Sequence, residues 1–519
     1  RTGRFLPSCS ANVVDGMEIS TKDEEVIKYR KLALDLLLSE HDADCFSPCK
    51  TSCPAGIDVR DYIILAKNSS DLDGFIRIRE KNPFVSVVGR VCPAFCEKDC
   101  SRTHLDSSLA IRLIKRRIGD TVYEKLDKEL FETEKKLIRN NKDSKKIAII
   151  ESGPAGLSCA YYLKINGHEP VIYEKEAELG GMLRYSIPEY RLPRTILDRE
   201  IASILRLGIE YKTKVNVDES MLVDLKKEYH KVIVSTGTWK ESGLGLGEAN
   251  HDNVFSALSF LKLVSTGNIN ISGKKAVVIG GGNSAIDSAR TLLRLGFSDV
   301  SLCYRRTRQQ MPAQSIEVED ALKEGVKLYE LLAPIELKDK KISFGVMELS
   351  CELDSSGRKK ICETGARVEK DFDVLVYAIG QKAANEFSID EKVLLCGDAK
   401  NGATSVIEAV SDGRKLALSF CMSNDELAFY SERQKGILVN DLSSYVSLKS
   451  HEAIHRLPEK RIKDFSEAEL GFTELTCTKE AERCLDCGCS SIQDCSLREL
   501  SLEYKAEPYK FKVNGSTGG

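Results

Sequence analysis

Several features that define whole classes of protein are missing from this sequence of 519 residues. Its 79 acidic and 76 basic side chains nearly cancel, so it lacks the charge excess that would attract nucleic acid or an anionic membrane surface. It contains no apolar run near the roughly 18 residues that cross a bilayer, and we expect no membrane insertion. The first residues also lack the short apolar core of a secretory signal peptide, which predicts a cytoplasmic protein.

Cysteine is abundant instead, and its distribution is uneven. Six of the 18 cysteines fall in 45–100 and five in 477–495. Because a reducing cytoplasm disfavours disulfides, clusters of this kind indicate metal ligation. The scattered cysteines between the clusters are interpreted as small buried hydrophobic residues. They are Cys159, Cys303, Cys351, Cys362, Cys396 and Cys421.

The centre of the chain opens with a strand–turn–helix–strand unit typical of dinucleotide-binding folds. An apolar run at 146–150 predicts a buried strand, and the glycine turn at 152–156 precedes a predicted helix. Glycines in such a turn let a pyrophosphate approach the positive N-terminal end of the helix. Glu174 ends the next strand, where an acid can bind the ribose of a nucleotide. The position of the first glycine holds Glu151, whose side chain crowds the turn and whose charge repels a diphosphate.

A second unit, at 275–304, has an intact glycine turn. Gly280, Gly282 and Ala285 have the spacing G-x-G-x-x-G/A between a strand and a helix. Its second strand is followed by Arg305 and Arg306 rather than by an acid, and guanidinium groups there suit the extra phosphate of NADP. NAD, with two solvated arginines, is the alternative. Two such units predict two nucleotide sites.

The two N-terminal groups of cysteines share one spacing, with three residues between neighbours, and each contains a Cys-Pro pair. A cube-shaped 4Fe–4S cluster needs thiolates from different directions, and a tight run with one remote cysteine, often beside proline, supplies them. Zinc is the alternative. The residues are Cys45, Cys49, Cys53, Cys92, Cys96 and Cys100.

A further group near the C-terminus supplies four thiolates within twelve residues. We interpret it as another 4Fe–4S site, again with zinc as the alternative, and Cys477 is a spare candidate ligand. The four residues are Cys484, Cys487, Cys489 and Cys495.

Six sequence blocks between 145 and 420 occur in the order typical of one family: SGPAGLSCAYYL (152–163), ELGGMLRYSIPEYRLP (178–193), VIGGGNSAIDSAR (278–290), YRRTRQQMPA (304–313), YAIGQ (377–381) and CGDAKNGATSVIEAVSDGR (396–414). This region resembles the flavin- and pyridine-nucleotide-binding part of the glutamate synthase small-subunit family, which is shared by the N-terminal part of dihydropyrimidine dehydrogenase. Departures from the family pattern are Glu151 and Ser186, each in place of a glycine, and Arg194 in place of a lysine.

The resemblance implies FAD on the first unit and NAD(P)H on the second, with Glu174 at the ribose, Gly181 near the pyrophosphate and Asp398 near the ribityl chain. It implies no acid–base side chain, because nicotinamide and flavin exchange hydride directly. The flavin residues implied are Gly153, Pro154, Ala155, Gly156, Glu174, Gly181, Arg191, Gly397 and Asp398. The nicotinamide-nucleotide residues implied are Gly280, Gly282, Asn283, Ser284, Ala285, Arg305, Arg306 and Gly380.

The same family has an N-terminal iron–sulfur domain with a stretch similar to GRVCPAFCEKDC (89–100). By that resemblance Cys53, Cys92, Cys96 and Cys100 form one complete cluster. The segment EHDADC (40–45) resembles a histidine-ligated segment of complex I and hydrogenase subunits, so His41 with Cys45 and Cys49 is a possible third site. Residues 6–21 resemble the end of a 2Fe–2S domain in which Cys9 would be the last ligand; the other ligands are absent, so that domain was lost or the start of the chain is missing.

We therefore expect an α/β protein with two Rossmann-like domains in a glutathione-reductase-like arrangement, an N-terminal α-helical iron–sulfur domain and a C-terminal iron–sulfur tail. Helical patterning occupies 22–40, about 57–80 and 108–126, and the charged segment 125–146 is predicted to be a solvated helix or linker. The expected divisions are 1–40, 41–145, 146–240 with 376–425 for FAD, 241–375 for NAD(P)H, and 426–519.

The predicted function is an electron-transfer oxidoreductase subunit that moves electrons between NAD(P)H and iron–sulfur clusters through FAD. Its expected partners are other redox subunits of a multisubunit complex, of hydrogenase or formate dehydrogenase type, or ferredoxin. One alternative is an electron conduit with a degenerate flavin site, in which Glu151 is the lesion. Another is a glutamate synthase small subunit. Dihydropyrimidine dehydrogenase is disfavoured because no substrate barrel follows residue 420.

Overall fold

The structure, a computed structural model, describes most of the chain as two compact units, residues 48–487 and residues 1–47 with 488–519. In the smaller unit, helices α1 (Glu24–Ser39) and α21 (Ser496–Glu503) pack together. Cys9, His41 and Cys45 lie outside the described residues. The described residues are 12–18, 20–39, 46–248, 251–354, 357–383, 387–421, 442, 445–489, 495–507 and 510–511.

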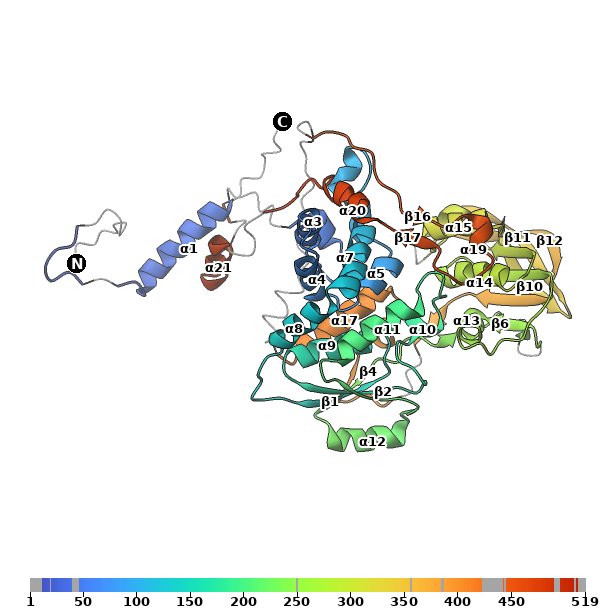
Figure 1. Ribbon diagram of the computed structural model, residues 1–519, viewed down its shortest axis with the longest axis horizontal. Helices are drawn as coiled ribbons and strands as arrows, with labels where there is room; N and C mark the ends of the chain where they lie inside the picture. Colours follow the sequence, from blue (N-terminus) through green and yellow to red (C-terminus); the bar gives the residue numbers. More distant parts are fainter. Residues whose placement is uncertain are drawn as a thin grey trace. The chain divides into compact units, whose positions relative to one another are not determined.

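The first dinucleotide-binding domain is built on a five-stranded parallel sheet of order β15-β4-β1-β2-β3. Its strands are almost fully buried in the centre because apolar residues occupy both faces, as parallel sheets require. Helices α9 (Pro154–Ile165) and α17 (Val406–Leu418) lie side by side against it (Figure 1). The strands are β1 (Lys146–Ile150), β2 (Glu169–Tyr173), β3 (Glu210–Lys212), β4 (Lys231–Val234) and β15 (Val393–Leu395).

A second five-stranded parallel sheet, of order β6-β13-β7-β8-β9, forms the other dinucleotide-binding domain. The chain enters it at β5 (Lys240–Glu241) and returns at β14 (Gln381–Lys382), and these two strands pair with each other. The last strand of this sheet, β13, ends at Ala378, shortly before β14. Its strands are β6 (Val254–Ser256), β7 (Lys275–Gly280), β8 (Asp299–Tyr304), β9 (Lys327–Glu330) and β13 (Val374–Ala378), and an antiparallel sheet of β10 (Leu332–Lys338), β11 (Lys341–Leu353) and β12 (Lys359–Asp371) precedes β13.

The N-terminal part of the larger unit is helical, as predicted, and its central helix is α7 (Ile111–Lys125). Helix α7 packs against α5, α4 and α3, and the C-terminal helix α20 (Glu474–Ala481) lies on α3 and α7 (Figure 1). The expected helix at 57–80 is two helices, separated where Ser69 adopts a left-handed backbone with φ of 58°. The remaining helices are α2 (Pro48–Thr51), α3 (Val59–Lys67), α4 (Asp71–Arg79), α5 (Val85–Val91), α6 (Phe95–Lys98) and α8 (Asp127–Leu137).

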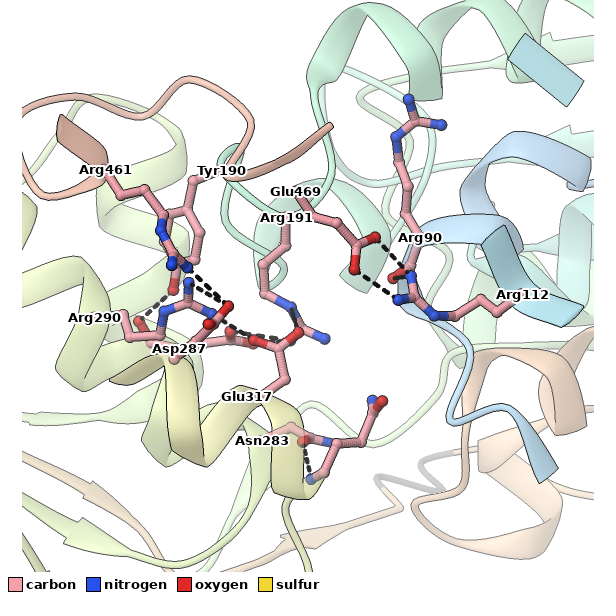
Figure 2. Close-up of polar contacts among 12 residues, drawn as sticks. Arg90, Arg112, Tyr190, Arg191, Asn283, Asp287, Arg290, Glu317, Arg461 and Glu469 are labelled. Carbon is pink, nitrogen blue, oxygen red and sulfur yellow. Dashed lines mark hydrogen bonds and ion pairs between the residues drawn. The ribbon is translucent and has the colours of Figure 1, made fainter. Parts of the chain in front are cut away.

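Residues 451–471, here called the strap, cross from the helical region to the second dinucleotide-binding domain. Figure 2 shows Glu469 of the strap paired with Arg112 of α7 (2.7 Å). In the middle of the strap Arg461 pairs with Asp320 (2.9 Å) of α15 (Ser315–Glu324). The strap includes β16 (Ile454–His455), α19 (Pro458–Arg461) and β17 (Glu469–Gly471).

Two expectations about buried residues were wrong in part. Cys159, Cys303 and Cys396 are buried as expected, but Cys351, Cys362 and Cys421 are exposed. The first two exposed cysteines lie on β11 and β12, which form a hairpin whose far end faces solvent.

No helix in the described part of the chain combines the length and the apolar character needed to span a membrane.

The segment that was expected to be solvated forms helix α8, and its Glu134 is fully buried. Glu134 Oε1 pairs with Arg79 Nε at 2.8 Å, and both side chains are at most 1% exposed. Arg79 also donates hydrogen bonds to the hydroxyls of Tyr123 (3.1 Å) and Ser203 (2.9 Å). This ion pair therefore fixes α8 to α4 and to the first dinucleotide-binding domain.

We predict that Glu134→Ala lowers the free energy of unfolding by about 3–5 kcal/mol, because it leaves the Arg79 guanidinium buried without its counter-charge. Urea denaturation of the two proteins measures the difference. Glu132→Ala, on the exposed face of the same helix, is the matched control and should change stability by less than about 0.5 kcal/mol. Equal effects of the two substitutions would show that the buried pair does not secure α8.

Candidate functional site

The two glycine turns open onto one shared cavity of about 380 Å³. Gly153, Pro154 and Ala155 line it from the first turn, and Gly282, Asn283 and Ser284 line it from the second. Both turns follow the carboxyl ends of central parallel strands, where ligands bind in open α/β sheets. The volume lies in the range typical of small-molecule sites. The sequence-predicted residues Gly181, Gly380 and Asp398 also line this cavity.

Close approach of two chain segments shapes the first half of the cavity. Gly181 has φ of 52°, and a Cβ atom there would lie 2.8 Å from Gly153 Cα. At Gly153 the backbone is ordinary (φ −62°), and a Cβ atom would meet nothing within 4 Å. Neither backbone strain nor packing therefore requires glycine at 153, whereas a ligand that contacts the backbone would. The residues thus fit a dinucleotide on this turn.

Glu174 is held in place by hydrogen bonds from the first turn. Its Oε2 accepts from the backbone N of Ser152 (2.9 Å) and from the Ser152 hydroxyl (2.5 Å), and Oε1 accepts from Glu176 N (2.9 Å). The carboxylate is buried at the end of β2. These bonds fix its orientation at the position where the ribose-binding acid was predicted.

Glu151 has a left-handed backbone with φ of 73°, only 7% of its surface is exposed, and it lines the cavity. Burial, together with the Glu174 carboxylate, raises the pKa of Glu151 to about 8. At neutral pH its carboxyl is therefore largely protonated, so it does not repel a diphosphate as an anion would. What remains unfavourable is the left-handed conformation of a residue with a Cβ atom, which costs about 1–2 kcal/mol.

Ser186, the other departure from the family pattern, causes no backbone strain. Its φ is −123°, an ordinary value for any residue, and its hydroxyl donates to Met182 O (2.9 Å). Asp398 accepts a hydrogen bond from the Thr404 hydroxyl (2.5 Å), and burial raises its pKa. Trp239 also lines the cavity, and we missed it although it is the single tryptophan of the sequence.

The second turn has the geometry of a dinucleotide-binding loop. Gly280 has φ of 144°, and a Cβ atom there would lie 2.4 Å from Ala378 O. At Gly282, the N-cap of α14 (Asn283–Arg294), a Cβ atom would again meet nothing within 4 Å. Asn283 Oδ1 accepts from the backbone N of Gln314 (3.1 Å), which ties the turn to α15 (Figure 2).

The predicted arginines have different environments. Arg305 is exposed just after β8, whereas Arg306 is buried, pairs with Asp354 (2.5 Å) and donates to Lys359 O (2.8 Å). Arg191 does not line the cavity: it pairs with Asp287 (2.8 Å) and Glu317 (3.1 Å) (Figure 2). Of these three, Arg305 is the residue whose guanidinium lies at the surface of the second domain.

Three of the cysteines that were assigned to the first cluster lie together in the helical region. Cys53 follows α2, Cys92 ends α5 and Cys96 lies in α6; all three are buried. Burial raises the pKa of the Cys96 thiol well above its usual range, and the charges of Cys53 and Cys92 add to this shift. The backbone N of Ala94 donates to Cys92 Sγ (3.4 Å), a type of bond that tunes iron–sulfur clusters.

Part of the C-terminal cysteine group also lies in the larger unit. Burial raises the pKa of the Cys484 thiol to about 12, with smaller contributions from the nearby Cys487 and Cys100. Helix α20 packs on α3 and α7 and so brings this part of the tail to the helical region. Cys489 and Cys495 belong to the smaller unit.

Cys49 is the second residue of α2 and is half-buried. Cys477 lies inside α20, and burial raises the pKa of its thiol to about 12. None of the described cysteines forms a disulfide. Within the described residues, no three His, Cys, Asp or Glu side chains converge closely enough to hold a single metal ion.

Comparisons with known proteins find two matching families and several similar proteins. The family described as pyridine nucleotide-disulphide oxidoreductase matches residues 145–409, and the family described as dihydropyrimidine dehydrogenase domain II, 4Fe–4S cluster, matches residues 40–126. Among solved structures, FprA of Mycobacterium tuberculosis in complex with NADPH is 18% identical, with a TM-score of 0.47 over 55% of this chain and 86% of that one.

Two curated relatives extend over most of the chain. The beta subunit of NADP(+)-dependent formate dehydrogenase from Moorella thermoacetica is 33% identical over 502 residues, which is 85% of this chain and 70% of that protein. The beta subunit of NADPH-Fe(3+) oxidoreductase from Geobacter sulfurreducens is 32% identical over 512 residues, 85% of this chain and 75% of that protein. This chain therefore belongs to the family of NAD(P)H-dependent oxidoreductases that join a flavin-binding pyridine nucleotide-disulphide oxidoreductase region to a 4Fe–4S domain.

Proposed function

We propose that this chain is an electron-transfer subunit that moves electrons between NAD(P)H and iron–sulfur clusters through FAD. The observation that carries the proposal is the single cavity lined by both glycine turns. A shared cavity lets a nicotinamide held by one turn meet a flavin held by the other. A flavin exchanges electron pairs with a nicotinamide and single electrons with clusters, which is the chemistry needed between them.

The residues of the first turn would hold the flavin dinucleotide. Gly153 and Gly181 leave room for its pyrophosphate, and Asp398, at the N-terminus of the short helix α16 (Asp398–Asn401), would bind its sugar chain. In the second domain Gly282 and Asn283 would bind the nicotinamide nucleotide at the start of α14. Arg305 would bind the 2′-phosphate that distinguishes NADP from NAD.

A direct contact links the cavity to the first cysteine group. Ser411 of α17 donates a hydrogen bond from its hydroxyl to the backbone O of Pro54 (2.8 Å), the residue after Cys53. The same helix contributes Val406 and Ala409 to the wall of the cavity. One rigid helix thus touches both the flavin cavity and the neighbour of a proposed cluster ligand, which supports electron transfer between the two.

We propose that Cys53, Cys92 and Cys96 bind one 4Fe–4S cluster and that Cys100, Cys484 and Cys487 contribute to a second. Thiolate ligands of this kind persist in a reducing compartment, so we propose a cytoplasmic protein. The tail would pass electrons to a partner redox subunit, in line with the subunit names of the relatives. We also propose that residues 146–240 with 379–421 form the flavin domain and residues 241–378 the nicotinamide-nucleotide domain.

Anaerobic purification of the full chain, followed by measurement of flavin, iron and sulfide, tests the proposal directly. We expect one FAD per chain, at least eight iron atoms and matching sulfide, and reduction of both flavin and clusters on titration with NADPH. Iron and sulfide without FAD, and no reduction by NADPH, would support an electron conduit instead. Glutamine-dependent activity on addition of a glutamate synthase large subunit would instead identify the chain as a glutamate synthase small subunit.

We predict that Glu151→Gly raises the free energy of unfolding of the apoprotein by about 1–2 kcal/mol, because glycine adopts the positive φ of this position without the cost that a Cβ atom brings. Urea denaturation of the two proteins measures this. Glu151→Ala is the matched control: it removes the carboxyl but keeps the Cβ atom, and it should gain much less stability. If the alanine variant gains as much as the glycine variant, the buried carboxyl rather than the backbone limits stability.

We also predict that FAD binding by the unaltered protein weakens as the pH rises through about 8. The raised pKa keeps Glu151 neutral below that pH, and above it the new negative charge lies beside the diphosphate. Glu151→Gln, which does not ionise, should show no such change between pH 7 and 9. An identical pH profile for both proteins would assign the titration to another group.

For the second site, Arg305→Ala should raise the KM for NADPH about tenfold and leave the KM for NADH unchanged, because a charge-assisted bond to phosphate contributes about 1.5–3 kcal/mol. Steady-state reduction of an artificial electron acceptor measures both constants. Lys323→Ala removes an exposed positive charge from α15 of the same domain and serves as the control. A similar effect of Arg305→Ala on both nucleotides would rule out selective recognition of the 2′-phosphate.

A further inference from the structure

Lys262 extends from the second dinucleotide-binding domain onto the first. It lies in helix α13 (Ala257–Ser265), and its Nζ pairs with Glu176 Oε1 at 2.6 Å. The same Nζ lies 5.7 Å from the ring centroid of Tyr185 and 5.7 Å from that of Trp239. Both distances fall within the roughly 6 Å over which a cation and an aromatic ring attract each other. One ammonium group thus contacts three separate segments of the other domain.

Each of these three segments belongs to the surroundings of the predicted flavin site. The backbone N of Glu176 donates to Glu174 Oε1 (2.9 Å), the carboxylate that was predicted to bind a ribose. Tyr185 ends the short helix α10 (Met182–Tyr185), whose first two residues line the shared cavity, and Trp239 lines the cavity itself. Lys262 therefore joins the second domain to the part of the first domain that surrounds this site.

Helix α13 forms part of the cavity wall that the second domain contributes. Its first residue, Ala257, lines the cavity, and the helix packs against α10 of the first domain (Figure 1). The backbone N of Leu258 donates to Glu241 Oε1 (3.0 Å), which ties the start of α13 to β5, the strand that connects the two domains. Lys262, further along the same helix, attaches this wall to the opposite one.

A second contact between the domains lies on a different helix. Arg191 of the first domain pairs with Asp287 of α14 at 2.8 Å, and both side chains are buried. Two domains that touch at one place and share connecting strands can still tilt by hinge or shear movement. A further contact on another helix removes that freedom, and Lys262 supplies it beside the cavity.

We propose that Lys262 is a positioning residue for hydride transfer: it holds the second domain closed on the first and so sets the distance between nicotinamide and flavin. The inference rests on the proposed function, because it requires both nucleotides in the shared cavity. Reacting atoms must come within about 3–3.5 Å, and a misplacement of about 1 Å can slow a reaction about a hundredfold. Lys262 does not line the cavity, so its effect is on geometry rather than on nucleotide binding.

The three contacts of Lys262 are individually weak and act together. The side chains of the ion pair, Lys262 and Glu176, are 37% and 21% exposed, so water screens their attraction. Each cation–π contact at a partly exposed site is similarly small. Because all three act on one ammonium group, they favour the closed arrangement by about tenfold in total.

The first test compares Lys262→Met with Lys262→Arg in the full chain, purified anaerobically with its cofactors. Stopped-flow absorbance follows reduction of the flavin over a range of NADPH concentrations. Methionine keeps the length and loses the charge, so we expect the rate constant at saturating NADPH to fall about tenfold while the Kd for NADPH changes less than about threefold. Arginine keeps the charge and its contacts with the rings, and it should restore most of the rate. Lys323→Met, at an exposed lysine of the same domain, is the matched control and should change neither constant.

A second measurement on the same proteins needs no flavin. Trp239 is the single tryptophan of the sequence, so the tryptophan fluorescence of the full chain reports on this contact alone. Quenching by acrylamide, which is uncharged, should rise at least about twofold in Lys262→Met, because the half-buried indole becomes more accessible when the domains tilt. Glu176→Gln should have a smaller effect, since the aromatic contacts remain, and it should add little to Lys262→Met.

The outcomes separate this inference from the proposed function. Unchanged quenching and an unchanged rate constant in Lys262→Met would overturn the inference and leave the proposed function intact. A change in only one of the two would also overturn it, because domain position and hydride transfer would then be unconnected. Equal losses in Lys262→Met and Lys262→Arg would assign the residue to packing. An unaltered protein without flavin would overturn the proposed function, and with it the role in hydride transfer, whatever the quenching shows.

Discussion

Helices α5 and α7 approach to backbone contact because both present glycine at the crossing. A Cβ atom at Gly89 would lie 2.6 Å from Arg116 Cα, and one at Gly119 would lie 2.5 Å from Ser86 Oγ. This crossing fixes where α7 lies, and α7 in turn directs its arginine side chains to two different places. Arg112 and Arg116 reach the strap, and Arg117 reaches α4. The placement of charge around the iron–sulfur region therefore depends on two glycines that contact no cofactor.

The strap transmits this placement to the nucleotide domains. Its carboxylates hold α7, and Arg461 in its middle holds α15, which also carries Glu317 against Arg191 and Arg290. Many opposite charges are buried at this junction. Removing one partner of a buried ion pair lowers stability by far more than the intact pair contributes. Such a junction sets the geometry between the helical region and the two glycine turns. It also explains why Arg191 is engaged here rather than in the cavity.

The parts of the fold and of the site that depend on local sequence pattern could be predicted from the sequence. The two glycine turns and the strands before them follow from apolar runs and glycine spacing, whereas Gly181 and Asp398 were implied by the family resemblance. The nearness of Cys484 to Cys100 does not follow from local pattern, because it depends on α20 packing against helices some 400 residues earlier in the sequence. Likewise, nothing local distinguishes the exposed Arg305 from Arg306, whose burial depends on Asp354 in the strand insertion.

Glu151 shows most clearly how burial alters a conclusion drawn from residue type alone. From residue type alone, Glu151 would be a negative charge in a diphosphate site. In the fold, however, Glu151 is buried beside Glu174. Two like charges that are buried so close together are unfavourable. Burial and the nearby Glu174 carboxyl therefore favour the neutral form of Glu151, and Ser152 and Glu176 donate hydrogen bonds to Glu174. Meanwhile glycine persists at 153 and 282, where the fold alone would accept a side chain. A site that had lost its ligand would not require glycine at either position. We therefore interpret the strained, left-handed backbone of Glu151 as compatible with a site that still binds its ligand.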